Sequence, residues 1–174
     1  AAWACGALTL PEAVKVIYYR SYYQAQTKGS GSMTAVSLSE EEIQALLSDL
    51  DLENVHIGGI NSFSGVTLAG DTEQLSQIES ILAKKNVFYA RLALDYAFHS
   101  PAMNTIKDDL LVSLADIKSK KTDIPFISTV TGEELATDKL NANYWWDNIR
   151  QPVQFRDALN TLIDDEQNCF VDIG

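Results

Sequence analysis

Two side chains of this sequence combine a reactive group with an unusual position, and the first is His99. It ends an apolar run and is followed at once by Ser100 and Pro101, a pair typical of a helix start. The positive end of a helix disfavours an imidazolium, so we expect His99 to stay neutral. A neutral imidazole can take a proton from a nucleophile, which predicts general-base chemistry. A purely structural role for one histidine at such a junction is the alternative.

The second is Arg20, which lies in line with the apolar face of a helix expected over residues 11–24. That face consists of Ala13, Val16 and Ile17. A guanidinium on an inward face needs a carboxylate or an anionic ligand. Arg20 is therefore a candidate anion-binding residue, with a structural ion pair as the alternative.

Two further positions have a weaker signal. The pair Gln151-Pro152 interrupts a predicted helix and frees backbone carbonyls near Asn148 and Gln151 from helical partners. Such a carbonyl could accept the second N–H of a histidine, although an ordinary helix end explains the pattern equally well. Asn61 has the features of a turn residue. The sequence contains no G-x-S-x-G, no H-E-x-x-H and no phosphate-binding loop.

The elements that must position these residues follow a regular order. Periodicity over 33–96 predicts β-α-β-β-α-β, which is a ferredoxin-like unit. Its predicted strands cover 33–38, 55–61, 65–70 and 87–98, and its helices cover 39–50 and 71–86. Outside it we expect a helix over 100–117, a strand over 125–132, two helices within 141–165 and a strand over 169–173. The expected fold class is α/β.

Composition limits the partners. The 174 residues include 13 Lys and Arg against 24 Asp and Glu, for a formal net charge of −11. This charge argues against nucleic acid and anionic membranes, and an anionic substrate would need a local cation. Cys5 and Cys169 are far apart, without metal-ligand spacing, and are expected to be small buried residues of a reduced, cytoplasmic protein. We see no signal peptide or membrane span, and both ends of the sequence look cut.

Six segments, taken in order, carry a resemblance to a known family. They are "AAWACGALTLPEAVKVIYYRS", "GSMTAV", "INSFSGVTLAG", "YAFHSPAM", "NYWWDNIRQPVQF" and "FVDIG". Together they resemble the acyltransferase domain of modular type I polyketide synthases and, more distantly, the malonyl-CoA:acyl carrier protein transacylases. The resemblance implies a hydrolase-like large subdomain, here partial, over 1–32 and 97–174. It also implies that the ferredoxin-like unit, over 33–96, is an inserted small subdomain.

The resemblance also implies a reaction. In that family a serine attacks an acyl-CoA thioester while the histidine matched by His99 takes its proton, and the acyl group then passes to the phosphopantetheine thiol of an acyl carrier protein. Arg20 matches the arginine that pairs with the free carboxylate of malonyl-type units. Asn148 matches the residue whose backbone carbonyl orients the histidine. Tyr96 and Phe98 fall in the motif of extender-unit choice, and Asn61 falls in a motif taken as substrate-binding.

The same resemblance sets expectations about selectivity and completeness. Phe98 fills space that an α-methyl group would need, so malonyl is favoured over methylmalonyl. Tyr22 replaces a usual second arginine, and Phe63 replaces a usual proline, which predicts a looser turn. The serine would precede Ala1, so the fragment alone is predicted inactive.

Acyl-CoA, the carrier protein and neighbouring synthase domains such as a ketosynthase are the expected partners, with no metal and no permanently bound cofactor. A methylmalonyl-selective transferase, an acyl hydrolase of the same fold, or a non-enzymatic ferredoxin-like binding module remains an alternative. The sequence upstream of Ala1 would decide between these readings, because a GHSxG motif there would favour the enzyme.

Overall fold

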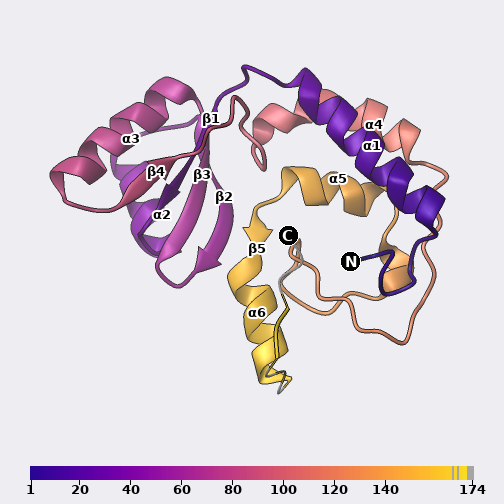
Figure 1. Ribbon diagram of the computed structural model, residues 1–174. Helices are drawn as coiled ribbons and strands as arrows, with labels where there is room; N and C mark the ends of the chain where they lie inside the picture. The colour runs from indigo at the N-terminus through magenta and orange to yellow at the C-terminus, as the bar shows by residue number, and fades with distance from the viewer. Residues whose placement is uncertain (166, 168, 172–174) are drawn as a thin grey trace.

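The centre of the molecule is a five-stranded sheet with the strand order β4-β1-β3-β2-β5 (Figure 1). The structure is a computed structural model that describes residues 1–165, 167 and 169–171. The strands are β1 (Ser32–Val36), β2 (Val55–Ser62), β3 (Gly65–Gly70), β4 (Tyr89–Arg91) and β5 (Val153–Gln154). The first four pair antiparallel, and β5 pairs parallel with β2.

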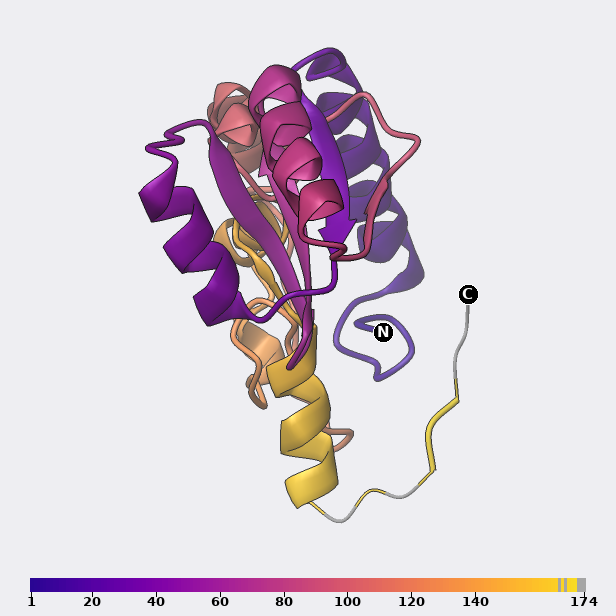
Figure 2. The same cartoon turned by 90° about the vertical axis from the view of Figure 1, so that its left-hand side faces the viewer.

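Two helices cover one face of this sheet, α2 (Glu40–Asp49) and α3 (Thr72–Lys84) (Figure 2). Ser39 caps α2 through a capping box with Glu42, and the Asp71 carboxylate accepts two backbone N–H groups at the start of α3. Their buried faces join alternate strand residues in one core, formed by Val36, Ile43, Val55, Val66, Leu68, Leu75, Ile78 and Leu82. The order β1-α2-β2-β3-α3-β4 confirms the predicted ferredoxin-like unit and the α/β class.

A second layer lies beyond the opposite face of the sheet (Figures 1 and 2). It contains α1 (Leu10–Gln26), the 3-10 helix η1 (Pro101–Ile106), α4 (Lys107–Ser113), the 3-10 helix η2 (Thr137–Lys139) and α5 (Ala142–Arg150). Its core includes the predicted apolar stripe of Met103, Ile106, Leu110 and Leu114, together with Tyr144, Trp146 and Ile149. The last helix, α6 (Phe155–Asp164), follows β5 and extends away from the sheet.

Several predicted elements differ from those observed. The helix expected over 100–117 is divided into η1 and α4, although Ser100 caps its start as predicted, accepting a hydrogen bond from the N–H of Ala102 at 3.2 Å. The strand expected over 87–98 contracts to three residues, and the segment over 125–132 forms one bridge, between Ile127 and Glu134. The strand predicted over 169–173 is not formed at 169–171, and its remaining residues lie outside the described ones.

Two burial predictions were also wrong. Ile17 is 65% exposed, because the buried face of α1 is narrower than its apolar pattern, and Cys169 is exposed rather than buried. At the turn that contains Phe63, Ser62 pairs with Gly65, and the Ser62 hydroxyl accepts a hydrogen bond from the N–H of Ser64 at 3.3 Å. Among the helices that the structure describes, none has the length and apolarity needed to cross a membrane.

Candidate active site

His99 lies between the sheet and the break that follows α5. Its backbone is left-handed, with φ of +58°, an uncommon conformation for a residue with a side chain that functional sites often retain. The backbone N–H of His99 donates to the Ile149 carbonyl at 3.2 Å. Its Nδ1 lies 2.9 Å from the Gln151 carbonyl oxygen and, facing an acceptor, must carry the proton. The second ring nitrogen, Nε2, is thereby left unprotonated in the neutral imidazole.

The helix end supplies this carbonyl, but from a different residue than predicted. Asn148, matched by the family resemblance, lies inside α5 and does not accept from His99. Carbonyls within a helix point along its axis, whereas Gln151 has extended backbone angles (φ −78°, ψ 154°) that turn its carbonyl sideways. Pro152 prevents the helix from continuing. The prediction that a backbone carbonyl at the helix break binds His99 was therefore correct, but that carbonyl belongs to Gln151 and not to Asn148.

The surroundings keep the His99 imidazole neutral. Burial lowers its pKa below the ordinary value of 6.5, the hydrogen bond to Gln151 opposes that shift, and the positive charge of Arg20 lowers the pKa further. Burial, rather than the start of the following helix, is the largest cause. The six-residue η1 is a short 3-10 helix, so the expected helix-end effect has a weak source.

Arg20 lies on α1, which begins at a capping box between Thr9 and Glu12. Its guanidinium is partly buried, and burial lowers its pKa. Within the described residues it forms no salt bridge, so the structural ion pair considered above is not observed there. Arg20 borders a cavity of about 330 Å³ whose other walls are apolar, among them Val16, Ile17 and Trp145. An unpaired cation beside apolar walls is suited to an anionic group on a small acyl chain.

The charge of Arg20 affects the pKa of His99, but the two side chains do not border the same cavity. His99 instead borders a second hollow of about 450 Å³, which also includes His56, Arg150 and Gln151. The effect of Arg20 on the pKa of His99 is the observation that connects the two side chains. The two side chains therefore border different cavities, which share no lining residue.

The remaining predicted site residues are Tyr96, Phe98 and Asn61. Tyr96 and Phe98 stack with ring centres 4.9 Å apart, and Phe98 packs against buried residues of both layers. Asn61 is exposed at the end of β2, where its side-chain amide donates to the Thr67 hydroxyl at 3.0 Å. This bond shows a turn-stabilising role, and no contact links Asn61 to the imidazole in the described part of the chain.

Sequence reasoning missed Gly58 and His56. A Cβ built on Gly58 would lie 3.6 Å from the His99 Cβ and 3.4 Å from the Phe98 carbonyl oxygen, so glycine allows the sheet to approach the imidazole closely. The two adjacent glycines in β2 were the available signal. His56 borders the same hollow as His99, and burial followed by the charge of Arg150 lowers its pKa.

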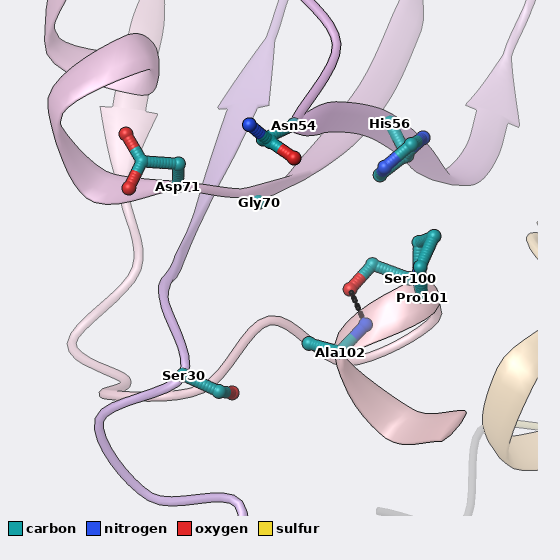
Figure 3. Close-up of a pocket in the computed structure, with 8 residues that line it drawn as sticks. All are labelled: Ser30, Asn54, His56, Gly70, Asp71, Ser100, Pro101 and Ala102. Atoms are coloured by element: carbon teal, nitrogen blue, oxygen red, sulfur yellow. Dashed lines mark hydrogen bonds between the residues drawn. The ribbon is translucent and has the colours of Figure 1, made fainter. Parts of the chain in front are cut away.

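A different hollow, of about 300 Å³, lies on the other side of His56 (Figure 3). His56 and Asn54 lie above it, and Pro101 and Ala102 lie below. Its polar groups are largely occupied, because Asp71 caps α3 and the Ser100 hydroxyl donates to the Ala97 carbonyl at 2.6 Å. It contains neither His99 nor Arg20, so the candidate active site is elsewhere.

Comparison with known proteins decides the family. The model of the acyl transferase domain matches residues 1–174. The chain belongs to the acyl transferase domain family. This membership confirms the family predicted from the six segments.

The relatives of this acyl transferase chain are large synthases, and the chain matches a part of each. It is 34% identical over 175 residues to polyketide synthase GfsB of Streptomyces halstedii, covering all of the chain and 3% of that protein. It is 37% identical over 173 residues to the highly reducing polyketide synthase alnA of Emericella nidulans, covering 95% of the chain and 7% of that protein. The chain thus spans a small share of the relatives that it matches.

Solved structures support the same assignment. The acyltransferase domain from module 8 of the salinomycin polyketide synthase matches with a TM-score of 0.90 at 32% identity, covering 95% of this chain and 39% of that one. A malonyl CoA-acyl carrier protein transacylase from Clostridium perfringens matches with a TM-score of 0.84, covering 93% of this chain and 52% of that one. Its identity is 19%, so this second match bears on the fold alone. The acyl transferase chain therefore has the fold of part of such a domain.

Proposed function

We propose that this chain forms the histidine-bearing part of an acyltransferase that transfers a malonyl extender unit from coenzyme A to an acyl carrier protein. The observation that carries the proposal is the imidazole of His99, whose Nδ1 is bound by the Gln151 carbonyl and whose pKa is held low. An imidazole fixed in one tautomer presents Nε2 as a base in a defined direction.

The proposed mechanism has two transfers. Nε2 of His99 takes the proton of a serine hydroxyl supplied by residues outside this chain, and the oxygen attacks the thioester carbonyl of malonyl-CoA. The tetrahedral intermediate collapses, and the coenzyme A thiolate leaves with the proton from the imidazolium. In the second transfer, Nε2 takes the proton of the carrier protein's phosphopantetheine thiol, which attacks the acyl-serine ester. The serine oxygen then leaves and recovers that proton. No permanently bound cofactor is required by this scheme.

Arg20 is proposed to bind the free carboxylate of the malonyl group. Its guanidinium has no carboxylate partner among the described residues and lies beside apolar walls, so two parallel N–H···O bonds to a substrate carboxylate would satisfy it. The stacked Tyr96 and Phe98 are proposed to limit the space at the α-carbon, which favours malonyl over methylmalonyl. Asn61, near the end of β2, is proposed as a further substrate contact.

The chain by itself is proposed to be inactive. One side of α1 presents a row of apolar side chains that the described residues leave exposed, including Leu10, Val14, Ile17 and Tyr18, with Trp3 nearby. A patch of this kind normally contacts another protein segment. Since the chain covers 39% of the salinomycin module 8 domain, we propose that further acyltransferase residues pack on this side of α1 and bring the serine to His99.

The decisive experiment joins the chain to the missing part of the domain. A chimeric domain, in which this chain replaces the matching part of the salinomycin module 8 acyltransferase, should load radiolabelled malonyl onto a carrier protein. The His99→Ala form should not load it, and the 174-residue chain alone should show no transfer. Release of label to water rather than to carrier would favour the acyl hydrolase. A stable chimera without acyl-serine formation would favour a non-enzymatic module.

A further inference from the structure

Arg156, at the start of α6, joins three elements of the fold. Its Nε donates to the Asp157 carboxylate at 2.7 Å, and its Nη2 donates to the Glu40 carboxylate on α2 at 3.4 Å. Its guanidinium carbon lies 5.8 Å from the ring centre of Phe63, at the tip of the β2–β3 turn. We call Arg156, Glu40 and Phe63 the Arg156 junction. It connects α6 with α2 and with the β2–β3 turn of the ferredoxin-like unit.

The junction is partly shielded from water. The Arg156 side chain is 18% exposed and that of Glu40 is 26% exposed, so their ion pair is screened less than a pair on the open surface. The carboxylates of Asp157 and Glu40 raise the pKa of Arg156. The guanidinium also makes a cation–π contact with the Phe63 ring, which remains 72% exposed.

The segment that leads to Arg156 begins at Gln151, whose carbonyl binds His99. Only residues 152–155 separate Gln151, whose carbonyl binds the imidazole, from Arg156. This stretch is held on one side by the pairing of Val153 with Gly59, and on another by a 2.7 Å bond from the N–H of Gln154 to the Thr129 carbonyl. Arg156 is thus close along the chain to the Gln151 carbonyl, with these two contacts between them.

The pairing of β5 with β2 is a weak means of fixing that position. It comprises two residue pairs in parallel orientation, and β2 has irregular register between Ile57 and Gly59 and again between Ile60 and Ser62. Short parallel pairings beside such irregularities specify register poorly. The sheet also contacts His99 closely at Gly58, so the distance between sheet and break controls both sides of the imidazole. Arg156 supplies a further contact between α6 and the ferredoxin-like unit.

We propose that Arg156 is a positioning residue for His99. By holding Glu40 and Phe63 against the start of α6, it keeps the Gln151 carbonyl at hydrogen-bond distance from Nδ1 and so keeps the imidazole in the Nδ1–H tautomer. The inference deepens the proposed function, because the tautomer decides whether Nε2 is free to act as base. The hydrogen bond itself can be measured without any catalysis.

Nitrogen-15 NMR of the imidazole distinguishes the two tautomers, and the chain has only two histidines to assign. Measured above the pKa of His99, the unaltered chain should show mainly the Nδ1–H form. Arg156→Ala should lower the ratio of Nδ1–H to Nε2–H by about fivefold, the factor that corresponds to one neutral hydrogen bond. Arg156→Lys, which keeps the charge opposite Glu40, should restore part of it. Lys15→Ala removes the remote Lys15–Asp116 ion pair and should leave the ratio unchanged.

A purely structural role would lower the melting temperature of Arg156→Ala without changing the tautomer ratio, and that result would overturn the proposal. If Arg156→Ala does not fold, Phe63→Leu replaces it, and an unchanged ratio in that variant has the same consequence. The outcome is separable from that of the proposed function. A chimera that fails to transfer malonyl, combined with a tautomer that depends on Arg156, refutes the reaction and leaves the positioning role intact.

Discussion

Replacing Arg20 should change which acyl group is accepted, more than how fast acyl groups are transferred in general. The guanidinium is partly buried and has no ion pair within the described residues, so its free N–H groups are available to a malonyl carboxylate. A hydrogen bond to a charged group contributes about 1.5–3 kcal/mol. Two such bonds at a partly exposed site, taken at the low end, contribute about 3 kcal/mol, or about 100-fold in kcat/KM.

The assay is acyl loading by the chimeric domain with malonyl-CoA and acetyl-CoA. Arg20→Ala should lower kcat/KM for malonyl by about 100-fold while leaving acetyl within about threefold, since acetyl has no carboxylate to lose. Arg20→Lys keeps the charge without the paired donors and should fall between the two. Equal losses with both substrates would show that Arg20 acts on folding or on the common chemistry, and the carboxylate role would have to be abandoned.

Three other outcomes follow from burial and charge. Phe98→Ser in the chimeric domain should raise the methylmalonyl-to-malonyl ratio of kcat/KM by about tenfold, as expected for space equal to one methyl group, and an unchanged ratio would remove Phe98 from selectivity. Leu110 is fully buried, so Leu110→Ala should lower the free energy of unfolding in urea by about 2–5 kcal/mol, and a loss below about 1 kcal/mol would contradict the packing. His56 and His99 have pKa values below 6.5 in the folded chain, so the unfolded chain binds more protons as pH falls from about 6.5. Stability should therefore decline below that pH and level off below the folded pKa values, and the double variant His56→Gln, His99→Gln should lose this part of the decline.

The ferredoxin-like unit was predictable because each of its elements carries a local signal. Ser39 with Glu42, and Asp71, mark helix starts, and alternation over 65–70 marks a half-buried strand. These signals depend on nearby residues alone. The position of His99 was also predictable, because the Ser100-Pro101 pair that follows it is typical of a helix start.

The wrong predictions concern features that are set by residues distant in the sequence. β4 contracts to three residues that pair with Thr34 to Val36 of β1, and the extent of a pairing with a distant strand is not revealed by the composition of 87–98. Gln151 rather than Asn148 holds the imidazole because the direction of a carbonyl depends on the backbone angles beyond the helix end. The Arg156 junction unites positions more than 90 residues apart, and nothing in the sequence around Phe63 indicates a guanidinium partner.

The charge of the chain and the chemistry of its site are connected through one side chain. A net charge of −11 would repel an anionic acyl group, so under the proposed function recognition depends on local positive charge such as that of Arg20. Burial is the main cause that lowers the pKa of His99, and the positive charge of Arg20 lowers it further. A carboxylate bound to Arg20 would offset this smaller contribution, whereas an acetyl group, which has no carboxylate, would leave it in place.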